Sequence, residues 1–66
     1  MLTQERYRAI LEILEERDAA TVTELAALVG TSESSIRRDL TVLDRDGKLR
    51  KVYGGATAIA RTEGAI

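Results

Sequence analysis

The 66-residue sequence contains no cysteine, histidine or proline, and its only aromatic residues are Tyr7 and Tyr53. Without cysteine it can form no disulfide bond, and without cysteine and histidine it lacks the usual zinc ligands. Ser–His and Cys–His nucleophile pairs are excluded for the same reason. A chain this short buries only about 60% of the surface that it exposes when unfolded. We therefore expect one small domain with an aliphatic core.

Long apolar runs are also missing, since the longest one covers only residues 25–29. A membrane span needs about 20 such residues, and no signal-peptide core or Gly-rich phosphate loop is present. The carboxylates stand at helical spacing on polar faces, which is typical of solvated surface, although a carboxylate pair could still perform acid–base chemistry. The sequence therefore predicts neither a membrane protein nor an enzyme, and it indicates no metal or cofactor.

The formal net charge of −1 argues at first against a nucleic-acid binder, but the charges are unevenly distributed. Residues 1–33 carry three basic and seven acidic side chains, a net charge of −4. Residues 34–66 carry seven basic and four acidic side chains, a net charge of +3. Such asymmetry indicates an anionic partner, although a basic solvated face would produce the same count.

Three amphipathic segments predict three helices. Tyr7, Ile10, Leu11 and Leu14 follow helical spacing within 3–16, with Thr3 as a candidate N-cap. A short connector, 17–20, precedes the second helix, in which Thr21 and Glu24 form a capping box and the apolar stripe comprises Leu25, Leu28 and Val29.

The third helix is expected over 33–46, with Ser32 as its cap and Ile36, Leu40 and Leu43 facing inward. Gly30 suits the end of the second helix, only two residues before that cap. A helix that ends in glycine, a short turn and a second capped helix form a helix-turn-helix unit.

The remaining chain changes period, because residues 49–53 and 56–59 are short β-type segments that flank Gly54-Gly55. This pattern predicts a hairpin that packs on the helices through Leu49, Val52 and Ile59. The expected fold is mainly α with a small β-hairpin, a winged helix-turn-helix of three helices and a wing. Residues 1–59 would form this domain, and 60–66 a tail or the start of a linker.

The third helix has a polar face opposite its apolar stripe, which consists of Ser34, Arg37, Arg38, Thr41 and Arg45. An α-helix fits the DNA major groove, where arginine can donate two hydrogen bonds to guanine and serine or threonine can bond bases. Arg37 and Arg38 are the principal candidates for DNA contacts, with Ser34, Ser35 and Thr41 as secondary ones. Contacts to the sugar–phosphate backbone are expected from Ser32, Lys51, Gly54, Gly55 and Arg6. Tyr53 could contact the backbone or pack within the wing.

Residues 32–40, Ser-Glu-Ser-Ser-Ile-Arg-Arg-Asp-Leu, resemble the recognition helix of the deoxyribose-operon repressor (DeoR) family of bacterial transcription regulators. That helix typically carries Thr-Ile-Arg-Arg-Asp-Leu, and residues 52–56, Val-Tyr-Gly-Gly-Ala, are similar to the Val-His-Gly-Gly-Ala wing of the family. The spacing of Arg6, Ile10 and Leu14 before Ser32 also fits. Two positions differ, because Ser35 stands where threonine is usual and Tyr53 where histidine is usual.

The resemblance implies a cytoplasmic bacterial regulator that binds a double-stranded DNA operator and represses genes of sugar metabolism. It also implies a full-length homo-oligomer with a following domain, absent from these 66 residues, that binds a phosphorylated sugar. A winged helix that binds another protein through its acidic first half is the main alternative. That alternative would require an exposed apolar patch of several hundred Å².

Overall fold

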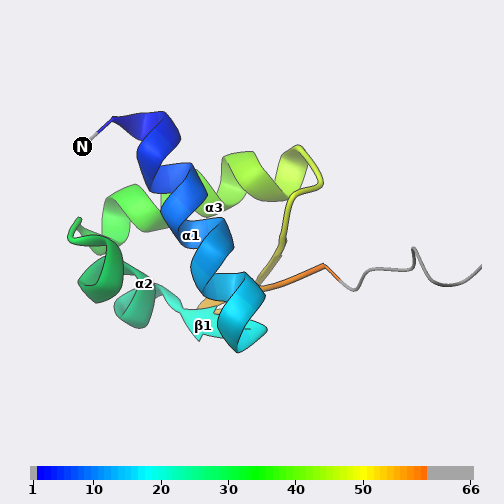
Figure 1. The fold of residues 1–66 in the computed structure, drawn as a ribbon. Helices are drawn as coiled ribbons and strands as arrows, with labels where there is room; N and C mark the ends of the chain where they lie inside the picture. The colour runs from blue at the N-terminus through cyan, green and yellow to red at the C-terminus, as the bar shows by residue number, and fades with distance from the viewer. Residues whose placement is uncertain (1, 60–66) are drawn as a thin grey trace, which may run out of the picture.

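The computed structural model describes residues 2–59, in which three helices are joined by short connections and pack beside a small sheet (Figure 1). The elements are α1 (Thr3–Arg17), β1 (Ala19–Thr21), α2 (Val22–Val29), α3 (Glu33–Arg45), β2 (Arg50–Val52) and β3 (Gly55–Thr57). The winged helix-turn-helix fold is therefore confirmed. The tail or linker expected at 60–66 lies outside the described residues.

The predicted helix caps are present at α2 and α3. The Thr21 hydroxyl accepts a hydrogen bond from the Glu24 amide, and the Glu24 carboxylate accepts one from the Thr21 amide, both at 3.0 Å. The Ser32 hydroxyl accepts from the Ser35 amide at 3.2 Å. At α1 the prediction is wrong by one residue, because Thr3 is already helical and Leu2 occupies the cap position. The Leu2 amide instead donates to the Glu5 carboxylate at 3.4 Å.

The turn between α2 and α3 depends on the left-handed conformation of Gly30, which has a φ of 85°. In this conformation the Gly30 and Thr31 amides both donate to the Ala26 carbonyl, at 2.9 and 3.0 Å. A side chain at Gly30 would be strained because L-residues rarely adopt this region. The tight turn brings the N-terminus of α3 directly after α2 and so fixes the helix-turn-helix unit.

The sheet has three antiparallel strands in the order β1-β3-β2, so the predicted hairpin gains a strand from the connector between α1 and α2. In the registers of the two ladders, Gly55 faces Thr21 of β1 and Val52 of β2. The sequence did not indicate β1, since three residues with two alanines carry no strand pattern. The extra ladder joins the wing to the helices, because β1 runs directly into α2.

The core lies between the three helices and one face of the sheet. It consists of Ile10, Leu14, Ala20, Val22, Leu25, Ala26, Val29, Ile36, Leu40, Leu43, Leu49 and Ala56. The prediction that Leu28 belongs to the core is wrong, because its side chain is 52% exposed. The buried side of α2 consists of Val22, Leu25, Ala26 and Val29. Val52 and Ile59 are exposed as well, and the wing packs through Leu49 and Ala56 instead.

Gly55 of β3 lies close against the backbone of β1. A Cβ atom at this position would lie against the carbonyl oxygen of Ala20 and 2.9 Å from the Cα atom of Thr21. We expect Gly55→Ala to lower the free energy of unfolding by about 1–3 kcal/mol, because backbone atoms would have to shift. Chemical denaturation measures the loss. The control is Gly54→Asn, at a position with open space and a φ of 79° that asparagine tolerates. Equal stability of Gly55→Ala and the wild type would contradict this packing.

Candidate nucleic-acid interface

The polar face of α3 is exposed along its length, as the helical spacing predicted. Ser34, Arg37, Arg38, Thr41 and Arg45 are all exposed, whereas Ile36, Leu40 and Leu43 on the opposite side are buried. The helix therefore presents hydroxyl and guanidinium donors to solvent on one side and aliphatic groups to the core on the other. A polar helix face of this composition can contact both base edges and phosphates.

Arg37 is held in place by a chain of polar contacts that begins on α2. The Arg37 guanidinium donates from Nη2 to the Glu33 carboxylate at 3.2 Å. The other oxygen of Glu33 accepts from the hydroxyl of Thr23 at 3.0 Å. Glu33 thus connects the first turn of α2 to the arginine one turn along α3.

Thr41 connects α3 to the wing. Its hydroxyl donates to the Arg37 carbonyl and accepts from the Lys51 ammonium group, both at 3.0 Å. Lys51 lies on β2, so the wing directs one of its cations toward the exposed face of α3. The wing therefore places one cation beside the exposed face of α3.

Arg38 differs from Arg37 because its side chain has no hydrogen bond or ion pair with the residues 2–59 that the structure describes. All five N–H donors of its guanidinium are therefore available to an external partner. Ser34, on the same exposed face, could supply a further donor or acceptor.

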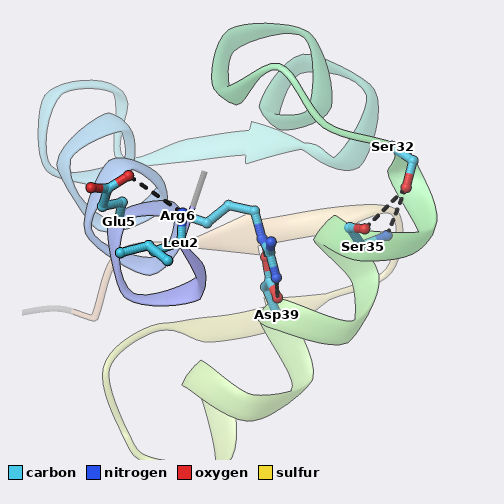
Figure 2. A network of polar contacts seen from close by, with 6 residues as sticks. All are labelled: Leu2, Glu5, Arg6, Ser32, Ser35 and Asp39. Carbon is cyan, nitrogen blue, oxygen red and sulfur yellow. Dashed lines mark hydrogen bonds and ion pairs between the residues drawn. The ribbon is translucent and has the colours of Figure 1, made fainter.

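Ser32 and Ser35 form hydrogen bonds with each other at the start of α3 (Figure 2). Besides capping the helix, the Ser32 hydroxyl donates to the Ser35 hydroxyl at 3.1 Å. Both remain close to the solvent, since Ser32 is exposed and Ser35 is half-buried. Their first role is to start the helix. The Ser35 hydroxyl accepts from Ser32 and keeps its own O–H, which can donate to a phosphate oxygen.

The wing contributes residues of two kinds. Tyr53 is fully exposed, with a relative exposure of 106%, and the adjacent Gly54 is exposed at the turn. Gly55 is buried against β1, where the packing of the sheet requires glycine, and its contact with the DNA backbone stays a prediction. The Gly54 carbonyl is also engaged, because it accepts from the Val22 amide at 2.9 Å.

Arg6 has its partner inside the protein (Figure 2). Its guanidinium donates two hydrogen bonds to the Asp39 carboxylate, one of them from Nη2 to Oδ1 at 2.9 Å. Asp39 is only 2% exposed and Arg6 20% exposed. The hydrogen bonds to Asp39 raise the pKa of the Arg6 guanidinium above its ordinary value. Arg6 therefore clamps α1 to α3, and its contact with a phosphate stays a prediction.

The sequence contains a signal for this pair that its analysis missed. Asp39 follows Ile36 by three residues and precedes Leu43 by four, so it stands on the apolar stripe of its helix. Arg6 likewise precedes Ile10 by four residues on the stripe of α1. Buried charges are normally paired, and opposite charges on the inward faces of two helices therefore indicate an ion pair between them.

Two other features of the described residues bear on the kind of site. Within 2–59, no group of three or more acidic side chains is arranged to hold a metal ion. No helix in that range has the length and apolar character required to cross a membrane. The exposed large apolar side chains are Leu2, Leu28, Ile59 and, next to each other in the wing, Val52 and Tyr53.

The fold and the exposed basic face of α3 define a winged helix-turn-helix DNA-binding domain. Residues 6–62 match the family model of the DeoR-like helix-turn-helix domain, and the chain belongs to this family. It is 43% identical over 60 residues, 91% of the chain, to the uncharacterized HTH-type transcriptional regulator FruR of Bacillus subtilis (strain 168).

Further relatives are also named transcriptional regulators. The chain is 36% identical over 63 residues, 96% of its length, to GolR of Listeria innocua serovar 6a. The chain is 38% identical over 61 residues, 92% of its length, to UlaR of Escherichia coli O1:K1 / APEC. The matched segment covers 24%, 25% and 24% of FruR, GolR and UlaR, so the chain spans about a quarter of the length of these relatives. The chain is therefore similar to the DNA-binding part of a transcriptional regulator.

Proposed function

We propose that this domain binds a specific operator in double-stranded DNA, with α3 in the major groove and the wing on the sugar–phosphate backbone. The observation that carries the proposal is that Arg37 and Arg38 are exposed on one face of α3, and that Lys51 of β2 donates to Thr41 on the same face. An exposed helix face of this kind fits the major groove, and lysine beside it can neutralise a phosphate.

The contacts divide into two groups under this proposal. Arg38 and Arg37 contact base edges, with Ser34 and Thr41 in supporting positions on the same face. Lys51, Tyr53, Gly54, Ser32 and Ser35 contact the backbone. Arg6 and Gly55 act indirectly, since the first holds α3 against α1 and the second allows β1 to approach the wing.

The salt dependence of binding tests this proposal directly. A duplex selected from random DNA should bind more weakly as salt increases, with a log–log slope of about −0.9 for each phosphate contact. Lys51→Ala should make the slope less steep by about 1, because one cation is lost. The control is Lys48→Ala, an exposed residue outside the proposed contacts. A slope near zero for the wild type would overturn the proposal.

For the whole protein we propose a cytoplasmic, homo-oligomeric repressor of sugar-metabolism genes, not an enzyme, whose following domain binds a phosphorylated sugar. The support is the family membership, together with relatives about four times as long as the matched segment. Residues 1–59 would be its DNA-binding domain and 60–66 the start of the connection. Release of the full-length protein from its operator by one member of a panel of sugar phosphates would support this proposal, and release by none would contradict it.

A further inference from the structure

Glu33 is an acidic residue that contacts Arg37 on the exposed side of α3, and DNA binding alone does not explain it. It is the first residue of α3, and its side chain is 44% exposed. A carboxylate in this place repels phosphates and so weakens every contact with the DNA backbone. Its two hydrogen-bond partners, Thr23 on α2 and Arg37 on α3, show that it is fixed rather than free in solvent.

We propose that Glu33 is a positioning residue that, through Arg37, makes the domain favour its operator over other DNA. This inference rests on the proposed function and extends it to a residue that is not among the proposed DNA contacts. The pair itself contributes little to the stability of the fold, because exposed ion pairs four residues apart in a helix are weak. Glu33 also suits the positive end of the helix dipole, and the effect that we assign to its contact with Arg37 is on the state of that arginine before DNA arrives.

The geometry leaves Arg37 able to contact a base while Glu33 holds it. Only Nη2 of Arg37 is used by Glu33, at 3.2 Å, and the guanidinium has five N–H donors in a rigid fork. Fixing the side chain in one direction reduces the conformational entropy lost when it meets a base edge. The carboxylate also offsets the arginine charge, so loose attraction to phosphates is reduced.

The fixed direction of Arg37 and the offset of its charge act differently on the operator and on an arbitrary duplex. Binding to an arbitrary duplex depends on phosphate attraction and is weakened by Glu33. Binding to the operator also depends on oriented base contacts and is assisted by a fixed arginine. Glu33 thereby increases the ratio of operator affinity to non-specific affinity, even though it lowers the total positive charge of the surface.

The test is E33Q, which removes the charge but keeps an oxygen that can accept from Thr23. The probes are a duplex selected from random DNA with the wild-type chain and a scrambled duplex of equal length. We expect the affinity of E33Q for the scrambled duplex to rise roughly threefold or more at low salt. We expect its affinity for the selected duplex to change less, so that the ratio of the two affinities falls.

The matched control is E16Q, which removes one carboxylate from α1 without touching the surface of α3. Any change in E16Q measures the general effect of net charge. The second arm repeats E33Q in an R37A background at low salt, where non-specific binding is strongest. If Glu33 acts through Arg37, the additional effect of E33Q on the affinity ratio should vanish there.

Three results would overturn the inference. E33Q could behave like E16Q, it could strengthen binding to both duplexes by one common factor, or its effect on the ratio could persist in R37A. Failure of the proposed function looks different, because the wild-type chain itself would then show no salt-dependent binding to either duplex. A thermal unfolding curve for each variant establishes that it is folded.

Discussion

Replacing Arg6 with alanine is expected to lower the thermal unfolding midpoint by roughly 10 °C or more. The reason is that the Asp39 carboxylate, which is 2% exposed, would lose its ion-pair partner without gaining access to water. Circular dichroism followed during heating measures the shift. Arg6→Lys should recover only part of the loss, because lysine cannot supply the two parallel hydrogen bonds of a guanidinium.

Two further variants determine whether the buried charge is the cause. Arg8→Ala removes an exposed arginine from the same helix and should leave the midpoint nearly unchanged. The double replacement Arg6→Met with Asp39→Leu should recover most of the stability, since apolar pairs often replace buried ion pairs without loss. If Arg8→Ala and Arg6→Ala lowered the midpoint equally, the ion pair would not be the source of the effect.

Replacing Arg38 with alanine is expected to reduce operator affinity by roughly 5- to 150-fold, equivalent to about 1–3 kcal/mol. Arg38 is exposed on α3 and has no partner among residues 2–59, so all of its donors can engage DNA. The loss for a scrambled duplex should be smaller, because only the operator offers the correct base edge. Fluorescence anisotropy with both duplexes measures the two affinities.

Arg17→Ala is the appropriate control for this experiment, since it removes the same charge from an exposed position at the end of α1. It should weaken both duplexes slightly and equally, as expected for a change in net charge. An Arg38→Ala variant with wild-type operator affinity would exclude Arg38 from the base contacts. An equal loss on both duplexes would instead assign it to the phosphate backbone.

The helices and their caps were predictable because local chemistry determines them. Thr21 with Glu24, and Ser32 alone, supply acceptors for amides that lack partners within their helices, and Gly30 ends α2 in a conformation that other residues avoid. The exposed face of α3 followed from the spacing of Ile36 and Leu40 in the same way. These features depend on residues within a few positions of one another.

The features that sequence analysis missed depend on partners distant in the chain. β1 forms only because β3, more than thirty residues later, provides its hydrogen bonds. Arg6 and Asp39 are separated by 33 positions, and their places on the apolar stripes of two helices indicate an ion pair only when the two helices are considered together. The burial of Gly55 against β1 is likewise invisible without the sheet. Structural roles were therefore not predicted for Arg6 and Gly55, which the sequence suggested only as contacts of the DNA backbone.

The hydrogen bond between Thr41 and Lys51 has a consequence for changing the specificity of this domain. A substitution of Thr41 by a residue without a side-chain oxygen removes the acceptor that holds Lys51 of the wing. Grafting the exposed residues of α3 onto another winged helix would transfer Thr41 without its lysine partner. Redesign of α3 must therefore change positions 41 and 51 together, so that a donor and an acceptor still face each other.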